Sequence, residues 1–227
     1  MRAIFKKSSP LLTKLYIAGL SSRHKCFAPV PLGEAKRLSH FIIDGKVNIP
    51  NFTHYSKCIS FKRDFVAGKI PTGLKIQLKN INLHGIKYTR AEKNTRALSI
   101  LWKKNRHAIS NYLNSVKTNS VESFSIISVP GIGETSEALG DILILGADIP
   151  VKIGFAIFLE ELLHSVVNVP AEFKDSNLNE EAYIGLHLYH LLNKLRYSSS
   201  VTDSVVFGWQ NGRREKLVKK LIESYSK

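Results

Sequence analysis

The feature that most constrains the fold is a nearly continuous apolar stretch in the second half of the chain. It begins with ALGDILILGAD (138–148), which is almost entirely apolar after Asp141 and therefore predicts a central, buried strand. The following segment carries apolar residues on almost every side when it is wound as a helix, and such a helix is buried. Asp148 can cap this helix, Pro150 suits its first turn and Pro170 ends it. We therefore expect a central buried helix at about 149–168.

The segments around this stretch predict the fold class. Strands are predicted from alternation, from short apolar runs or from Val, Ile and Phe content at 73–88, 97–102 and 120–129. Helices are predicted at 107–116, 175–197 and 211–224. This order of elements predicts an α+β domain in which helices pack on a small mixed sheet.

The charge of the chain favours a polyanionic partner. Its 227 residues carry a formal net charge of +15, and the sequence pI is about 9.8. Residues 1–110 hold 22 Lys+Arg against 4 Asp+Glu, whereas residues 111–227 hold 11 against 14. Nucleic acid is the first candidate and an anionic membrane surface the second. No apolar run reaches the roughly 18–20 residues of a membrane span, so we expect none.

The N-terminal segment is typical of a mitochondrial transit peptide. MRAIFKKSSPLLTKLYIAGLSSRHKCF is basic and contains serine, and the first acidic residue of the chain is Glu34. We assign residues 1–30 to this segment, expect cleavage between about 20 and 35, and predict a location in the mitochondrial matrix. The alternative is a basic arm that binds nucleic acid. Residues 31–96 are then a basic region with short strands.

The chain has two cysteines, Cys26 and Cys58. They form no CxxC pair, which excludes a structural zinc site built on thiolates. We expect no disulfide framework and a reducing compartment.

Four short motifs occur in a characteristic order in the second half of the chain. They are ALSIL (97–101), Leu113-Asn114, NSVESF (119–124) and LGDILI (139–144). In order and spacing they resemble the YbeY-type rRNA maturation factors, which are α+β metal-dependent endoribonucleases with a three-histidine site. The resemblance covers about residues 97–195. It implies a domain at 97–200, followed by a basic, helical C-terminal extension at 201–227.

The resemblance also implies a degenerate metal site. It places His164 on the first histidine of the family, Asn168 on the second and Lys174 on the third. An amide oxygen is a weak ligand and an ammonium repels a cation, so we favour loss of catalysis and no cofactor. Zinc is the expected ion if His164 and Asn168 still hold one. From the residues alone, His164 is also interpreted as a partly buried histidine held by Glu160, one turn earlier on the helix.

Several basic residues are candidates for RNA contact. A lysine at 174 would replace the metal ion with a fixed positive charge that contacts a phosphate. A second cluster combines cations with Tyr88 and Trp102, a mixture that suits phosphate contact and base stacking. Its alternative is a solvated basic surface. The candidate cations are Lys174, Arg90, Lys93, Arg96, Lys103, Lys104, Arg106 and, on the C-terminal helix, Arg213 and Arg214.

These observations favour an RNA-binding protein. We expect it to act in mitochondrial rRNA maturation or small ribosomal subunit assembly, with rRNA and the mitochondrial ribosome or its precursor particles as partners. One alternative is an active metal-dependent endoribonuclease of the same family. Another is a structural, ribosome-associated protein without catalytic activity. His187 and His190 have no evident third ligand, so we interpret them as residues of a helix surface.

Overall fold

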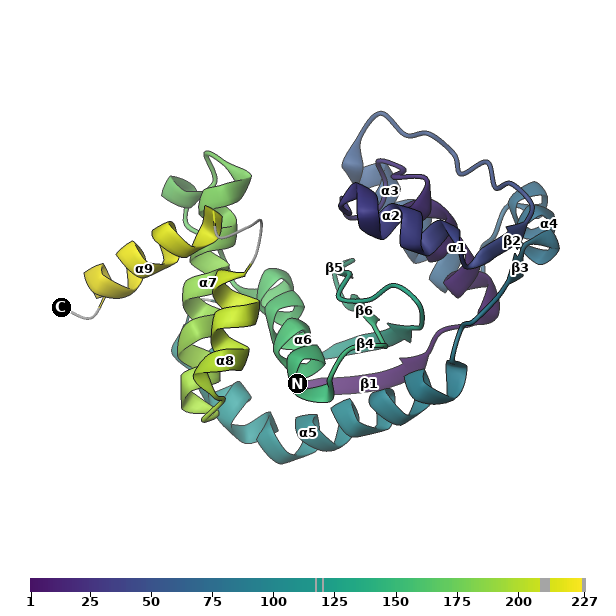
Figure 1. Ribbon diagram of the computed structural model, residues 1–227. Coiled ribbons are helices and arrows are strands. Elements are labelled where there is room, and N and C mark those ends of the chain that lie inside the picture. Colours follow the sequence, from purple (N-terminus) through teal and green to yellow (C-terminus); the bar gives the residue numbers. More distant parts are fainter. Residues whose placement is uncertain (117, 120, 209–212, 226–227) are drawn as a thin grey trace. The chain divides into compact units, whose positions relative to one another are not determined.

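The computed structural model describes residues 1–116, 118–119, 121–208 and 213–225, and it has an α+β fold (Figure 1). The chain divides into two compact units. The sheet unit comprises Ile4–Ala97 and Ser125–Ile149, and the helical unit comprises Met1–Ala3, Leu98–Phe124 and Pro150–Lys227. Both units are discontinuous in sequence, and one of their borders, between Ala97 and Leu98, lies beside the division predicted at residue 96. The other predicted divisions, at residues 30 and 200, stay predictions.

A four-stranded mixed sheet lies mostly in the sheet unit. Its strand order is β1 (Arg2–Lys7), β4 (Ser123–Val129), β6 (Ile142–Gly146) and β5 (Ser136–Ala138). β4 and β6 are parallel, while β5 and β6 are antiparallel. β6 has a neighbour on each side, which confirms that the apolar segment at 138–148 supplies an inner strand. At its end, a Cβ on Gly146 would lie 1.7 Å from the carbonyl oxygen of Gly133, so this position requires glycine.

Four helices supply most of the core of the sheet unit. They are α1 (Pro10–Ser21), α2 (Leu32–Ser39), α3 (Tyr55–Val66) and α4 (Thr72–Asn80). Their buried apolar residues join those of β4 and β6 in one cluster. Ser9 caps α1, because its hydroxyl accepts from the backbone N–H of Leu12 at 3.2 Å. A short antiparallel pair, β2 (Ile42–Asp44) with β3 (Asn82–Leu83), completes the unit.

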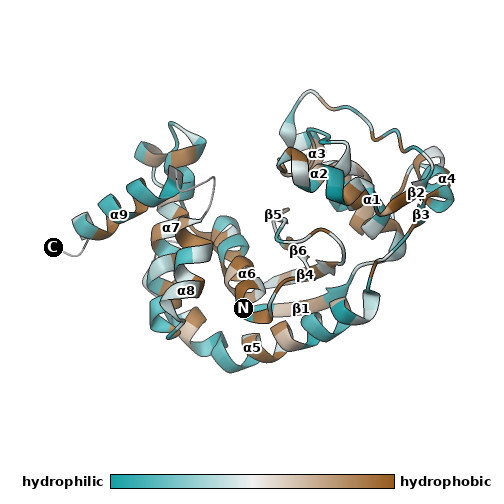
Figure 2. Cartoon of the chain, viewed as in Figure 1, coloured by the Kyte–Doolittle hydropathy of each residue, from teal (hydrophilic) through white to brown (hydrophobic). Residues whose placement is uncertain are grey.

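The helical unit contains the second part of α5 (Tyr88–Ser115) and all elements after β6. Its centre is α6 (Val151–Val166), which is buried along most of its length and confirms the predicted central helix. α6 packs against α7 (Asn177–Lys194), and α7 packs against α9 (Arg213–Tyr225). Hydrophilic residues are frequent along α5 and α9 in Figure 2. The short elements are η1 (Ala171–Phe173), α8 (Ser199–Thr202) and η2 (Asp203–Phe207).

The strand predicted at 73–88 is wrong for its first half, which forms α4, while Asn82–Leu83 in its second half form the short strand β3. Leu74 and Leu78 are buried, whereas Ile76 between them is 54% exposed. Apolar residues at positions i, i+2 and i+4 fit an alternating strand, but the outer two also share one face of a helix. The pattern was therefore ambiguous, and the burial of only its outer members identifies the helix.

The strand predicted at 97–102 is wrong for the same reason. It lies inside α5, where Leu98 and Trp102 are buried and Ile100 is 65% exposed. The helix predicted at 107–116 is the end of this 28-residue helix. The strand at 120–129 and the helices at 175–197 and 211–224 are confirmed, within the described residues, as β4, α7 and α9.

The N-terminal segment is part of the folded core. β1 is an edge strand of the sheet, and Leu15, Ile17 and Leu20 of α1 are completely buried. Cleavage between residues 20 and 35 would remove this strand and this helix from the sheet unit. In this structure residues 1–30 are thus largely packed into the fold, and their role as a transit segment or a basic arm stays a prediction. The location in the mitochondrial matrix stays a prediction.

The two cysteines form a disulfide, so the expectation that they would not is wrong. Cys26 follows α1 and Cys58 lies on α3, and their Cα atoms are 5.1 Å apart. They are separated by 32 residues in sequence. No local pattern indicates that the end of α1 meets α3, because that meeting depends on how the helices pack.

Candidate functional site

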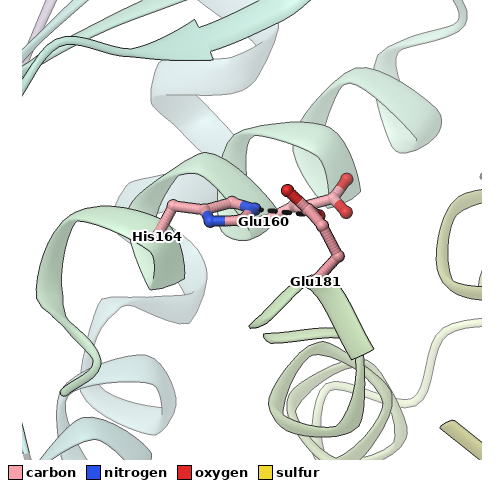
Figure 3. Close-up of side chains that lie close together, drawn as sticks. All are labelled: Glu160, His164 and Glu181. Atoms are coloured by element: carbon pink, nitrogen blue, oxygen red, sulfur yellow. Dashed lines mark ion pairs between the residues drawn. The ribbon is translucent and has the colours of Figure 1, made fainter. Parts of the chain in front are cut away.

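A cluster of ionisable side chains lies in the interior of the helical unit. Glu160 and His164 are four residues apart on α6, so they share one face of this helix. Glu181 faces them from α7, which begins where the Ser176 hydroxyl accepts from the backbone N–H of Asn179 at 3.2 Å. Figure 3 shows the three side chains converging. The Nε2 atom of His164 is 3.3 Å from a carboxylate oxygen of Glu181.

Arg214 of α9 completes this cluster, which we call the clasp: Glu160, His164, Glu181 and Arg214. Arg214 is completely buried. Its Nη1 donates to a carboxylate oxygen of Glu160 and lies 3.4 Å from Glu181 Oε2. Its Nε and Nη2 donate to the backbone carbonyls of Val206 at 2.9 Å and Val205 at 2.6 Å. The guanidinium therefore joins α9, η2, α6 and α7.

His164 supplies a second positive charge to the clasp. Burial alone would lower the pKa of His164, but a hydrogen bond to Glu181 and the charges of Glu181, Glu161 and Glu160 outweigh it and raise the pKa to about 9. His164 is consequently cationic at neutral pH. The two positive groups, His164 and Arg214, then balance the two carboxylates of Glu160 and Glu181.

The ligand types in the clasp are those of a transition-metal site. One histidine nitrogen and two carboxylate oxygens, from Glu160, His164 and Glu181, lie within 4.8 Å of one another. Such donors suit zinc and neighbouring divalent ions. In this structure, however, Arg214 contacts both carboxylates. The clasp is therefore an ionic network, and a metal ion would have to compete with the guanidinium.

His164 lies among candidate metal ligands, whereas Asn168 lies beyond the end of its helix, and the role of either residue as a ligand stays a prediction. α6 ends at Val166 and the backbone of Val167 is extended, so Asn168 no longer follows the helical face of His164. The Glu160–His164 spacing is visible in the sequence, and Glu160 does lie one turn before His164 as interpreted. The ion pair of His164, however, is made to Glu181. Neither Glu181 nor Arg214 could be connected with His164 from sequence alone.

Lys174 lies outside the clasp. It is exposed immediately after η1. Among the described residues, the ion pairs of the clasp join His164 to Glu181 and Arg214 to both glutamates, and none of them involves this lysine. The expectation that Lys174 replaces a metal ion is therefore wrong. Arg214 is the residue whose positive charge lies among the candidate metal ligands.

Six of the predicted RNA-binding residues lie on the exposed side of α5. The first α5 triad, in the sheet unit, is Arg90, Lys93 and Arg96; the second α5 triad, in the helical unit, is Lys103, Lys104 and Arg106. Buried residues of α5, such as Leu98 and Ile109, occupy its other side. Within the part of the chain that is described, no member of either triad forms a salt bridge.

Other predicted contact residues are not available to RNA in this structure. Arg214 is buried in the clasp, and Trp102 is only 5% exposed because its ring packs edge-to-face on Phe158 at 5.6 Å. The assignment of Arg214 to RNA contact is therefore wrong, and Trp102 is a residue of the core. The side chain of Arg213 lies outside the part of the structure that is described. Tyr88, which is 37% exposed, keeps an accessible ring.

A second group in the helical unit surrounds His187, which we had interpreted as a surface residue. Its Nδ1 is hydrogen-bonded to the hydroxyl of Tyr112 at 2.8 Å, and its ring is 4.8 Å from that of Tyr183. Its Nε2 is buried and has no hydrogen-bond partner among the described residues. Burial, followed by the charge of His190, lowers the pKa of His187 to about 4. The surface interpretation is wrong for this residue.

This environment predicts that acid destabilises the helical unit through His187. The unfolded chain binds a proton at His187 below about pH 6.5, whereas the folded chain does so only near pH 4. The contribution to stability is therefore present above pH 6.5 and is lost as the pH falls towards 4, by at most about 1.4 kcal/mol per pH unit. Urea unfolding from about pH 7.5 to about pH 4 should show a weaker decline in His187→Gln than in the wild type.

His107→Gln is the matched control for this measurement, because His107 is exposed on α5. It should retain the pH dependence of the wild type. If His187→Gln and His107→Gln lose stability equally as the pH falls, His187 does not remain neutral in the folded protein.

Comparison with known proteins leaves the resemblance to YbeY-type factors a prediction. No family model matches the chain, and no curated protein or solved structure is detectably similar to it. One of the motifs that carried the resemblance departs from it. ALSIL lies in the helix α5 and not in a first core strand, whereas LGDILI enters a strand, β6, as the resemblance implies.

Proposed function

We propose that the protein binds RNA through the two α5 triads and holds it by phosphate contacts. The observation that carries this proposal is the exposure of six Lys and Arg side chains on one helix whose only acidic residue is Glu92. The carboxylate of Glu92 is paired with Lys7 at 2.9 Å. Arg96 also acts electrostatically on this carboxylate, so it is the positive charge of the other five cations that is left for an external anion.

The chemistry of the triads fits a phosphate backbone. The cations of the first triad are spaced three residues apart and extend over about two helical turns. Those of the second triad are one and two residues apart and lie within about one turn. A polyanion that binds such cations releases its condensed counterions, which favours binding at low salt. Both units are also net basic: the sheet unit has 18 Lys+Arg against 8 Asp+Glu, and the helical unit has 15 against 10.

An anionic membrane is the less favoured partner. A helix that binds a membrane surface inserts its apolar face between the lipids. In α5 that face is already buried in the protein through residues such as Leu98, Trp102 and Ile109, and Ile100 is its most exposed large apolar residue. No helix in the described residues has the length and hydropathy needed to cross a bilayer.

The triads favour contact with the phosphate backbone of RNA over recognition of particular bases. Trp102 is buried, which leaves Tyr88 as the exposed aromatic residue of α5. Sequence-specific RNA recognition relies on stacking and on hydrogen bonds to base edges, and α5 offers few groups for either. A partner with extensive accessible backbone, such as rRNA in a maturing or assembling ribosomal subunit, fits this surface. We do not propose that the protein cleaves RNA, because Arg214 pairs with both carboxylates that a catalytic metal ion would need.

Neutralising either triad should weaken RNA binding. In Arg90→Gln/Lys93→Gln/Arg96→Gln, and separately in Lys103→Gln/Lys104→Gln/Arg106→Gln, we expect at least a roughly tenfold loss of affinity at ~150 mM salt. The slope of log K against log salt should become shallower by about 2, because three phosphate contacts are lost. Fluorescence anisotropy with a labelled RNA, repeated across salt concentrations, measures both quantities.

The matched control removes the same charge from another helix. Lys216→Gln/Lys219→Gln/Lys220→Gln changes three exposed lysines of α9 and should reduce affinity by less than about threefold. Equal losses in all three variants would show that net charge alone binds RNA and would contradict a surface on α5. Triad-dependent binding to anionic vesicles, with no binding to RNA, would favour the membrane instead.

A further inference from the structure

We infer that Glu160, His164 and Glu181 form a latent site for a divalent transition-metal ion, which Arg214 keeps closed. This inference is independent of RNA binding, because it concerns the interior of the helical unit. It assigns Arg214 the role of an internal cation that takes the place of the ion.

The three ligand atoms are close to the spacing that such an ion requires. Zinc lies about 2.0–2.2 Å from nitrogen and oxygen ligands, so two ligands at tetrahedral angles are about 3.4 Å apart. His164 Nε2 and Glu181 Oε2 are 3.3 Å apart. The carboxylate of Glu160 is within 4.8 Å of both partners, at the end of a side chain with rotatable bonds. Three ligands leave a fourth position for water.

The donor types select the class of ion. An imidazole with two carboxylates suits zinc, manganese or iron. Calcium requires six to eight oxygen ligands, and the clasp supplies too few. The fit is therefore to a first-row divalent ion at a site enclosed between α6 and α7.

Arg214 closes this site by using the same two carboxylates. Its Nη1 contacts both Glu160 and Glu181, and it enters from α9, a different element from the ligands. The buried carboxylates need a compensating cation. Without the guanidinium, the two carboxylates would face only His164. A divalent ion that binds as the Nε2 proton of His164 is released to water would neutralise both carboxylates. Closure therefore depends on one side chain.

The test replaces Arg214 with methionine in the untagged, full-length protein and measures zinc by equilibrium dialysis. Arg214→Met should bind one zinc ion per chain at least roughly tenfold more tightly than the wild type. The chain contains 8 histidines, so zinc bound elsewhere must be separated from zinc in the clasp. Arg214→Met/His164→Leu keeps the other histidines, and it should lose the additional zinc.

Two results would overturn the inference. One is a folded Arg214→Met protein that binds zinc no better than the wild type. The other is equal zinc binding by Arg214→Met and by the double variant, which would place the ion outside the clasp. If Arg214→Met does not fold without metal, circular dichroism replaces dialysis: zinc should restore folding in the single variant but not in the double variant. Failure of zinc to restore it would equally overturn the inference.

Discussion

Replacing Lys62 with methionine is expected to lower the free energy of unfolding by about 3–5 kcal/mol, the typical cost of breaking a buried ion pair. Lys62 is completely buried on α3. Its ammonium donates to the carbonyl oxygen of Cys26 at 2.7 Å and to a carboxylate oxygen of Glu137. The other oxygen of Glu137 accepts from the hydroxyl of Tyr16. Without Lys62, the buried carboxylate of Glu137 has lost its counterion.

Urea unfolding under non-reducing conditions, which preserve the Cys26–Cys58 disulfide, measures this loss. Lys57→Met is the matched control, because Lys57 is exposed on the same helix, and it should change stability by less than about 0.5 kcal/mol. Lys62→Met/Glu137→Leu should recover much of the loss, since replacing both members removes the isolated charge. Equal stability of Lys62→Met and Lys57→Met would contradict the importance of the pair.

The second large effect is expected at Arg214. In the presence of a chelator, Arg214→Met should also lower the free energy of unfolding by about 3–5 kcal/mol. The substitution leaves Glu160 and Glu181 with His164 as the remaining cation of the clasp. It also removes the donors that bind the carbonyls of Val205 and Val206. The effect should appear in urea unfolding followed by circular dichroism.

Lys219 provides the comparison for Arg214 within α9. It forms an exposed pair with Glu215, and such surface pairs contribute at most about 1 kcal/mol. Lys219→Met should therefore unfold at nearly the same urea concentration as the wild type. Adding Glu160→Leu to Arg214→Met should recover part of the lost stability, because one buried carboxylate is removed. A loss in Arg214→Met no greater than that in Lys219→Met would show that the clasp does not stabilise the helical unit.

Much of the fold could be predicted where the local pattern has one interpretation. The apolar run after Asp141 predicts β6. The next segment predicts α6, because it carries apolar residues on nearly all sides when wound as a helix. The runs at 73–88 and 97–102 were predicted incorrectly because their apolar residues fit both strand and helix. Which of the two structures forms depends on which apolar residues the rest of the chain buries. These are Leu74 and Leu78 in the first run, and Leu98 and Trp102 in the second.

The candidate site was predictable only in part. The sequence places Glu160 one turn before His164, and that relation holds because both lie within one helix. The choice of Asn168 assumed that the helix continued, but α6 ends at Val166. Arg214 was predicted as an RNA-contacting cation of the C-terminal helix, whereas its carboxylate partners, Glu160 and Glu181, lie 54 and 33 residues away in sequence.

The sequence by itself determined the features that depend on neighbouring residues. These are the apolar residues on nearly all sides of α6 and the spacing of Glu160 and His164, both of which follow from the periodicity of a helix. Only the tertiary structure decided the pairing of Cys26 with Cys58, of Lys62 with Glu137 and of Arg214 with Glu160, across 32, 75 and 54 residues. A lysine or an arginine can be buried when packing brings a carboxylate to it. The neighbouring residues in sequence do not indicate which distant carboxylate that is.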